Sequence, residues 1–113
     1  MAEPGERCLL SRVWKAEGSW ERARGLLGRE PLGPHEAMLL DPCWLVHTFG
    51  MAYALDLAFV DAAGRIRKLS YGVRPRRIAG SPGARQTLEC AAGVLAGLRL
   101  EVGDRVQWRE ARS

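Results

Sequence analysis

Glycine and proline interrupt this chain at short intervals, and that spacing limits its possible folds more than any other feature. The 113 residues include 13 Gly and 6 Pro. Short apolar or alternating segments lie between the breaks, a pattern typical of β-strands. Six or seven such strands favour a mostly β (α+β) fold, either a small antiparallel β-barrel or a folded sheet, with two short helices. The predicted strands are 8–15, 37–40, 44–48, 54–60, 65–71, 86–90 and 105–110, and the predicted helices are 20–27 and 91–98.

The clearest local pattern is a β-hairpin around the turn residues Asp61 to Gly64. The segment after this turn, 65–71, alternates basic and apolar residues, as a strand with one face in water does. The next segment, 72–84, contains several Gly and Pro residues and is predicted to be a long surface loop.

One domain, residues 1–113, is the expected organisation, because no internal repeat or long polar linker divides the chain. Residues 1–6 are expected to be disordered, and they lack the basic start and apolar run of a secretory signal. The longest stretch without a charged residue, Pro42 to Leu55, is shorter than the roughly 18 to 20 apolar residues of a membrane-spanning helix. We therefore expect a cytoplasmic protein without a transmembrane segment.

The three cysteines, Cys8, Cys43 and Cys90, are widely spaced and form no Cys-x-x-Cys pair. This pattern argues against a disulfide framework and against a four-thiolate zinc site. On one strand face Cys43 and His47 have a spacing at which both could bind a metal, but no further ligands follow at a diagnostic spacing. We predict reduced thiols, no metal and no cofactor. His47 is then a half-buried residue hydrogen-bonded to a neighbour.

Phosphate-loop, dinucleotide-binding and Gly-x-Ser-x-Gly motifs are absent. The most unusual polar residue is Asp56, which lies within the apolar segment 54–60 and shares a face with Ala54, Ala58 and Val60. A carboxylate at such a position needs partners. Backbone amides or an Arg can satisfy it in a structural role, or it belongs to a pocket for binding or proton transfer.

The basic residues are unevenly distributed. The net charge is +4, yet the segment from Ala62 to Leu88 has seven basic residues and no acidic one, so the rest of the chain is net acidic. Arg can bind phosphate or carboxylate through two parallel hydrogen bonds, although a solvated basic face without a partner is the alternative. Tyr71 is the one aromatic residue near the centre of this segment, which fits sequence-independent phosphate contacts better than base recognition. The seven residues are Arg65, Arg67, Lys68, Arg74, Arg76, Arg77 and Arg85.

Five blocks of the sequence follow one another in a recognisable order. They are Arg24–Arg29, Ala37–Leu40, Leu55–Asp61 with Gly64, Leu88–Gly93 and Val102–Val106. In order and spacing they resemble the bacterial and archaeal family catalogued as domain of unknown function 192, over about residues 19–108. The resemblance implies a compact β-rich domain with short helices, and it implies no established reaction.

The chain departs from the family pattern before its Leu-Asp pair. Members commonly have Phe-Trp-Met-Lys-Asn-Thr there, whereas this chain has Val46 to Met51, without the Lys and Asn. His47, Thr48 and Asp56 are the polar residues that remain. The chain resembles more closely a subgroup with a His-x-Phe-Gly-Met block and a basic loop, in which an aromatic residue often stands where this chain has Arg76.

The leading hypothesis is a non-enzymatic binding or accessory protein with a basic surface. Its partner would be an acidic protein, a nucleic acid or a small anion that contacts the segment from Arg65 to Arg85. The alternative is a small enzyme or ligand-binding protein with a polar site around His47, Asp56 and Arg24, and a third possibility is a structural subunit. Convergence of His47 and Asp56 in a cleft would favour the enzyme. The candidate binding residues are Arg24, His47, Asp56, Arg74, Arg76 and Arg77.

Overall fold

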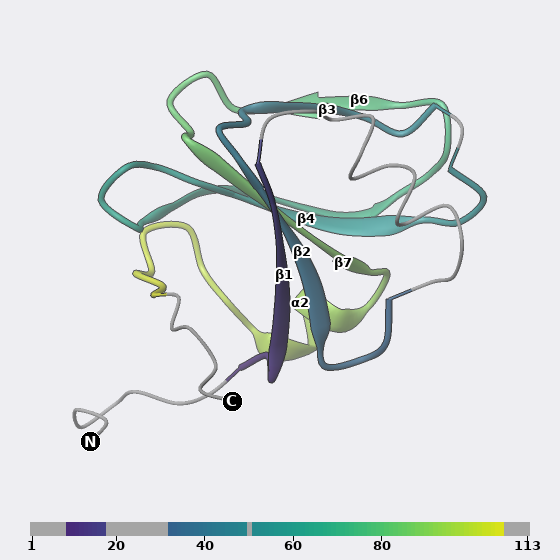
Figure 1. Cartoon of the computed structure of the whole chain (residues 1–113), viewed down its shortest axis with the longest axis horizontal. Coiled ribbons are helices and arrows are strands. Elements are labelled where there is room, and N and C mark those ends of the chain that lie inside the picture. The colour runs from purple at the N-terminus through teal and green to yellow at the C-terminus, as the bar shows by residue number, and fades with distance from the viewer. Residues whose placement is uncertain (1–8, 18–31, 50, 108–113) are drawn as a thin grey trace.

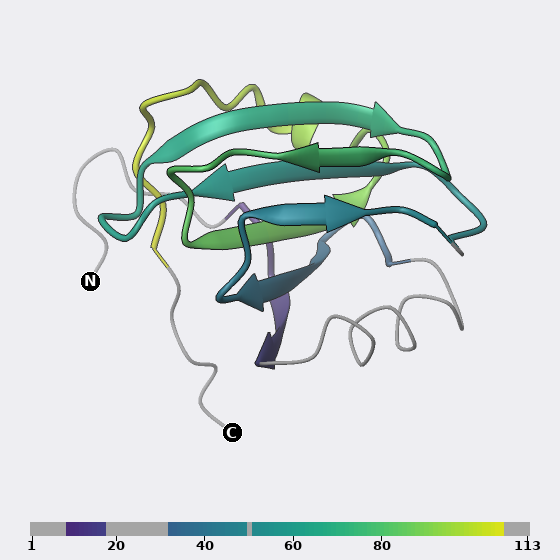
Figure 2. The ribbon, with the colours of Figure 1, turned by 90° about the horizontal axis from the view of Figure 1, so that it is seen from above.

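The computed structural model of the chain describes residues 9–17, 32–49 and 51–107. Within these residues, seven strands form two sheets, and one short helix lies beside them (Figures 1 and 2). The elements are β1 (Arg12–Glu17), β2 (Glu36–Asp41), β3 (Leu45–His47), β4 (Leu55–Val60), β5 (Ile66–Val73), β6 (Ile78–Gly80), β7 (Gln86–Ala91) and α2 (Val94–Leu98).

The larger sheet has five strands in the order β1-β2-β7-β4-β5. Its neighbours are antiparallel except for β1 and β2, which are parallel. The smaller sheet consists of β3 and β6, which pair antiparallel and cover one face of the larger sheet, while α2 lies against the other face (Figure 1). Consequently, β4 and β7 are interior strands with a layer on each side.

Two apolar clusters hold these layers together. The first lies between the two sheets and includes Val46 of β3, and the second lies under α2 and includes Leu95. All six residues of β4 are buried, because successive side chains of an interior strand point into one cluster and then the other. A charged residue at any position of such a strand must therefore be buried as well.

The predicted hairpin is confirmed and has a clear local cause. The Asp61 carboxylate accepts hydrogen bonds from the backbone N–H groups of Ala63 at 2.9 Å and Arg65 at 3.0 Å. These bonds fix the turn between β4 and β5 and lower the pKa of Asp61, the bond from Arg65 most strongly. Gly64 adopts a φ of +85°, a left-handed conformation that glycine tolerates at little cost.

The mostly β fold is confirmed, but other parts of the prediction change. The described residues form no closed barrel, since β1 and β5 remain separate edges of an open sheet. The parallel pairing of β1 with β2 also corrects the expectation of a wholly antiparallel arrangement. The predicted helix over 20–27 lies outside the described residues. The helix predicted over 91–98 starts only at Val94, because Gly93 has a left-handed φ of 93°.

The segment 72–84 is not simply a loop, because it contains β6, which pairs with β3. The last predicted strand, 105–110, is reduced in its described part to an isolated bridge between Arg105 and Arg65. No helix of the described residues is long and apolar enough to cross a membrane.

Candidate functional site

Three arginines occupy the turn between β5 and β6, which we call the arginine loop (Arg74–Arg77). Arg74, Arg76 and Arg77 are all exposed. The salt bridges of the described residues all involve other cations, so no carboxylate in this part of the chain neutralises the loop. Among the described residues, the side chain of Arg77 donates from Nη1 to the Arg76 carbonyl at 3.3 Å. The loop thus presents three guanidinium groups to solvent.

Thr48, at the end of β3, holds the arginine loop in place. Its buried hydroxyl donates to the Arg74 carbonyl at 2.6 Å and accepts from the Arg77 N–H at 2.9 Å. Its backbone N–H donates to the Arg77 carbonyl at 2.8 Å, and its carbonyl accepts from the Arg76 N–H at 3.3 Å. The side chain and the backbone of one residue therefore fix the position of the loop relative to the small sheet.

Arg76 adopts an unfavourable backbone conformation. Its φ is +64°, in the left-handed region that costs a residue with a Cβ atom about 1–2 kcal/mol. Backbone strain of this kind persists where the surrounding structure imposes it, and it is concentrated at binding and catalytic sites. The Thr48 hydrogen bonds supply that constraint here.

The outer face of the small sheet is unusually apolar. We call four exposed residues of this face and the half-buried His47 the outer strip: Trp44, Leu45, His47, Phe49 and Ile78. Phe49 is 46% exposed and Ile78 is 66% exposed. His47 is paired with Ile78 across the sheet, and its ring centroid lies 5.8 Å from that of Phe49. Because Phe49 follows Thr48 directly, this aromatic pair lies next to the arginine loop.

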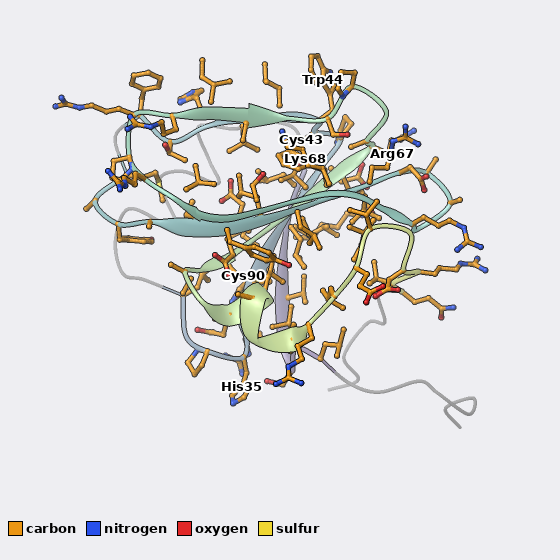
Figure 3. All side chains as sticks on the ribbon, turned by 180° about the vertical axis from the view of Figure 1, so that it is seen from behind. His35, Cys43, Trp44, Arg67, Lys68 and Cys90 are labelled. Atoms are coloured by element: carbon orange, nitrogen blue, oxygen red, sulfur yellow. The ribbon has the colours of Figure 1, made fainter. Side chains whose placement is uncertain are left out.

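Gly80 keeps the other end of the outer strip flat. It pairs with Leu45, and a Cβ atom at this position would lie 2.8 Å from both Leu45 Cδ1 and the Trp44 carbonyl oxygen. The Gly80 carbonyl accepts a hydrogen bond from Lys68 Nζ at 3.1 Å, which brings a cation to this end as well. Figure 3 shows Trp44 pointing away from the five-stranded sheet, above Lys68.

Asp56 lies in a different part of the structure. It is fully buried on β4, opposite Cys90 of β7, on the face that carries α2. One carboxylate oxygen accepts the N–H of Gly72 at 2.8 Å. The other accepts the N–H groups of Gly93, Leu95 and Ala96 at 3.0 to 3.2 Å. Asp56 therefore holds the start of α2. This geometry corresponds to the first of the two roles considered for Asp56, a structural carboxylate bound by backbone amides, and not to the second, a carboxylate in a binding pocket.

Glu89 is a second fully buried carboxyl group, and it faces the opposite side of the sheet. It pairs with Met38 and Leu57, both members of the cluster between the sheets. Neither carboxyl oxygen has a hydrogen-bond partner among the described residues. Burial raises the pKa of Glu89 to about 8. Burial, together with the nearby Glu89 charge, also raises the pKa of the Cys43 thiol and the Tyr53 hydroxyl.

Comparisons with known proteins place the chain in a family. The profile of DUF192, described as an uncharacterized ACR, matches residues 2–108. The chain belongs to the DUF192 family. The resemblance found in the sequence blocks is thus confirmed. No curated protein matches the chain.

Two solved structures share the fold of this DUF192 chain. A protein of unknown function from Novosphingobium aromaticivorans DSM 12444 is 27% identical, with a TM-score of 0.74 over 85% of this chain and 74% of that one. A chain from Sinorhizobium meliloti 1021, provisionally described as a transcription regulator, is 27% identical, with a TM-score of 0.71 over 82% of this chain and 78% of that one.

Some of the residues singled out in the DUF192 chain come together and others do not. His47 lies beside the arginine loop, because β3 pairs with the strand that follows the loop. Asp56 lies on the other side of the five-stranded sheet, and Arg24 is outside the described residues. Cys43 does not join His47 on an outer face: it packs against the cluster between the sheets, and its thiol donates to the Leu45 carbonyl at 3.3 Å. The described residues contain no group of three potential metal ligands.

Phe49 and Glu89 were not identified from the sequence. Phe49 lies outside the basic segment in the sequence, and the pairing of β3 with β6 and the hydrogen bonds of Thr48 bring it near the arginine loop. Glu89 alternates with Leu88 and Cys90, a pattern that normally places a Glu in water. The central position of β7 buries both of its faces instead.

Near the β4–β5 turn, at the other end of the basic segment, acidic residues lie beside the basic ones. A shallow depression of about 370 Å³ lies beside the β4–β5 turn and includes Asp41, Asp61 and Arg85 in its lining. Its acidic residues lie near cations: Arg85 Nε, in the lining, lies 3.5 Å from Asp41 Oδ1, and Arg67, outside the lining, lies 3.8 Å from Asp61. This depression holds none of the predicted binding residues, and its charges largely compensate one another.

Proposed function

We propose that this DUF192 protein is a non-enzymatic binding or accessory protein that binds an acidic partner through the arginine loop. The observation that carries the proposal is the set of three exposed arginines, fixed by Thr48, with no carboxylate partner in the described part of the chain. Arginine is suited to this task because its planar fork binds phosphate or carboxylate through two parallel hydrogen bonds.

The lack of acidic residues in the segments around the arginine loop also supports an acidic partner. The small sheet and its connections are formed by two segments, Pro42–Leu55 and Ala62–Leu88, and neither contains an Asp or Glu. An approaching anion therefore meets no repulsive charge from these segments. Unpaired charges of one sign raise the local concentration of the opposite charge and accelerate association.

The positions of His47 and Asp56 favour binding over catalysis. The two side chains lie in different layers, and both oxygens of Asp56 are occupied by backbone N–H groups. A general acid–base pair needs two groups within hydrogen-bond reach of one substrate, which this separation does not offer. The provisional description of the Sinorhizobium chain as a transcription regulator is consistent with a binding role.

Retention on immobilised heparin, a generic polyanion, tests the proposal. The variant in which Arg74, Arg76 and Arg77 are all changed to Ala should elute at clearly lower salt than the parent. A matched control changes Arg12, Arg85 and Arg105, which are also exposed, and removes the same charge. We expect the control to retain most of the affinity. Equal losses in the two variants would show that net charge alone causes retention, and the proposal would then be wrong.

A further inference from the structure

We infer that the acidic partner is a single-stranded nucleic acid, with phosphates on the arginine loop and bases stacked along the outer strip. This inference rests on the proposed function and adds the chemical class of the partner. It starts from two features that the fold brings to one end of the small sheet although they are far apart in the sequence. These are the exposed ring of Phe49, with the half-buried His47 beside it, and the three arginines of the loop that Thr48 holds.

The first step concerns Phe49 and the loop. Thr48 lies between His47 and Phe49 in sequence, and the hydrogen bonds of Thr48 reach both Arg74 and Arg77. A half-exposed ring thus follows directly the residue that is hydrogen-bonded to the backbone of the arginine loop. Proteins that bind single strands combine these two elements, because a positively charged surface follows the phosphates while aromatic rings stack on the bases.

The second step concerns the length of the outer strip. Trp44 is 47% exposed, and it lies at the opposite end of β3 from Phe49. At about 3.3 Å per residue, the chain from Trp44 to Phe49 spans at most about 17 Å when extended. With at least about 3.4 Å between successive nucleotides, this distance accommodates roughly three to five of them. The absence of a side chain at Gly80 lets Leu45 lie close against β6 at the Trp44 end of this stretch.

The third step distinguishes this partner from other polyanions. The outer strip offers mainly apolar and aromatic surface, and its polar side-chain atoms are the ring nitrogens of Trp44 and His47. A duplex hides the faces of its bases, so it could use the arginines but not the rings. An acidic protein would likewise pair with the arginines and gain little from stacking. Single strands use both features, and stacking tolerates any base, so we expect weak sequence preference.

The experiment compares two probes, a fluorescein-labelled oligothymidine of twelve nucleotides and heparin, against the full chain at low salt. The informative variant is Phe49→Leu, which keeps apolar bulk and all charges but removes the ring. Stacking contributes enough per base that its loss should weaken oligothymidine binding at least fivefold. Heparin binding should stay the same. Trp14→Leu is the matched control, because Trp14 is also exposed and also lies beside an arginine, Arg12, but on β1.

The outcomes separate the inference from the proposed function. Binding of oligothymidine that is weakened by Phe49→Leu and not by Trp14→Leu supports the inference. Heparin binding that depends on the arginine loop, without oligothymidine binding at tens of micromolar protein, overturns the inference and leaves the proposed function intact. Equal affinity for a duplex of the same length also overturns it. If changing the three arginines of the loop weakens binding of neither oligothymidine nor heparin, the proposed function itself is wrong.

Discussion

Asp56 and Glu89 show how the same chemical group takes opposite roles on adjacent strands. Both are fully buried on interior strands of one sheet. Asp56 faces α2, where three backbone N–H groups point at one of its oxygens, and the N–H of Gly72 in β5 points at the other. Glu89 faces the apolar cluster between the sheets, where no described residue bonds to it. A buried carboxylate is stable when hydrogen-bonded and costly when not, so the two residues should respond oppositely to substitution.

Replacing Asp56 with Ala should strongly destabilise the fold. The change leaves four backbone N–H groups without their acceptor, at least one of them, that of Leu95, within a fully buried residue. A stranded buried donor costs about 1–3 kcal/mol, so the Leu95 N–H alone predicts a loss of about 1–3 kcal/mol in the free energy of unfolding by urea, and the other three donors add to it. Asp104→Ala is the control, because Asp104 also accepts a backbone N–H, from Glu101 at 2.9 Å, but is exposed. Similar midpoints for the two variants would contradict a structural role for Asp56.

Replacing Glu89 with Gln should change how stability depends on pH. The folded state holds the Glu89 proton up to about pH 8, whereas a carboxyl with the ordinary value of 4.5 loses it in the unfolded chain. Between these values the folded state binds more protons, so the free energy of unfolding falls as pH rises. The difference in pKa corresponds to about 5 kcal/mol when complete. Glu89→Gln removes the titration and should be more stable than the parent at pH 9.

Urea unfolding at pH 5, 7 and 9 measures this effect. The parent and Glu89→Gln should diverge steadily as pH rises, whereas the exposed control Glu101→Gln should follow the parent at every pH. Parallel curves for the parent and Glu89→Gln would show that Glu89 has an ordinary pKa in the folded protein.

At the scale of elements, the conformation of the arginine loop positions its charges but lowers the stability of the fold. Arg76 has a left-handed φ of +64°, which glycine would adopt without the steric cost of a Cβ atom. Arg76→Gly and Arg76→Ala both remove the guanidinium group, but only the first relieves the strain. We expect Arg76→Gly to be about 1 kcal/mol more stable than Arg76→Ala in urea unfolding, while both elute equally early from heparin. Equal stability would show that the loop relaxes out of the left-handed conformation.

Sequence patterns predicted the elements that depend on neighbouring residues. They did not predict the elements that depend on pairing between distant segments. The Asp61–Gly64 turn was predictable because its hydrogen bonds join residues two and four positions apart. In contrast, β6 has three residues and is defined by its pairing with β3, so 72–84 resembled a loop. The parallel pairing of β1 with β2 likewise could not be predicted from the residues of either strand alone. The candidate site follows the same rule: sequence identified His47 and the arginines separately, and their proximity depends on Thr48 bonds that span up to 29 residues.

At the scale of the whole molecule, the fold divides the basic segment between the two ends of β5. Near the β4–β5 turn, Arg67 and Arg85 lie close to Asp61 and Asp41. At the other end, the arginine loop has no carboxylate partner in the described part of the chain and adjoins the outer strip. A net charge of +4 therefore understates how concentrated the uncompensated charge is. The two ends of β5 should therefore differ in the number of counterions that are released from a polyanion when it binds there.

The salt dependence of oligothymidine binding measures that difference. Each single-strand phosphate neutralised contributes about −0.7 to the slope of log affinity against log salt concentration. Changing Arg74, Arg76 and Arg77 to Ala should therefore flatten the slope by about two units. Changing Arg12, Arg85 and Arg105 should leave it nearly unchanged, because those arginines lie away from the loop and Arg85 already contacts Asp41. If the second triple flattened the slope as much as the first, the nucleic acid would be following the whole basic surface, and the arginine loop would have no special role.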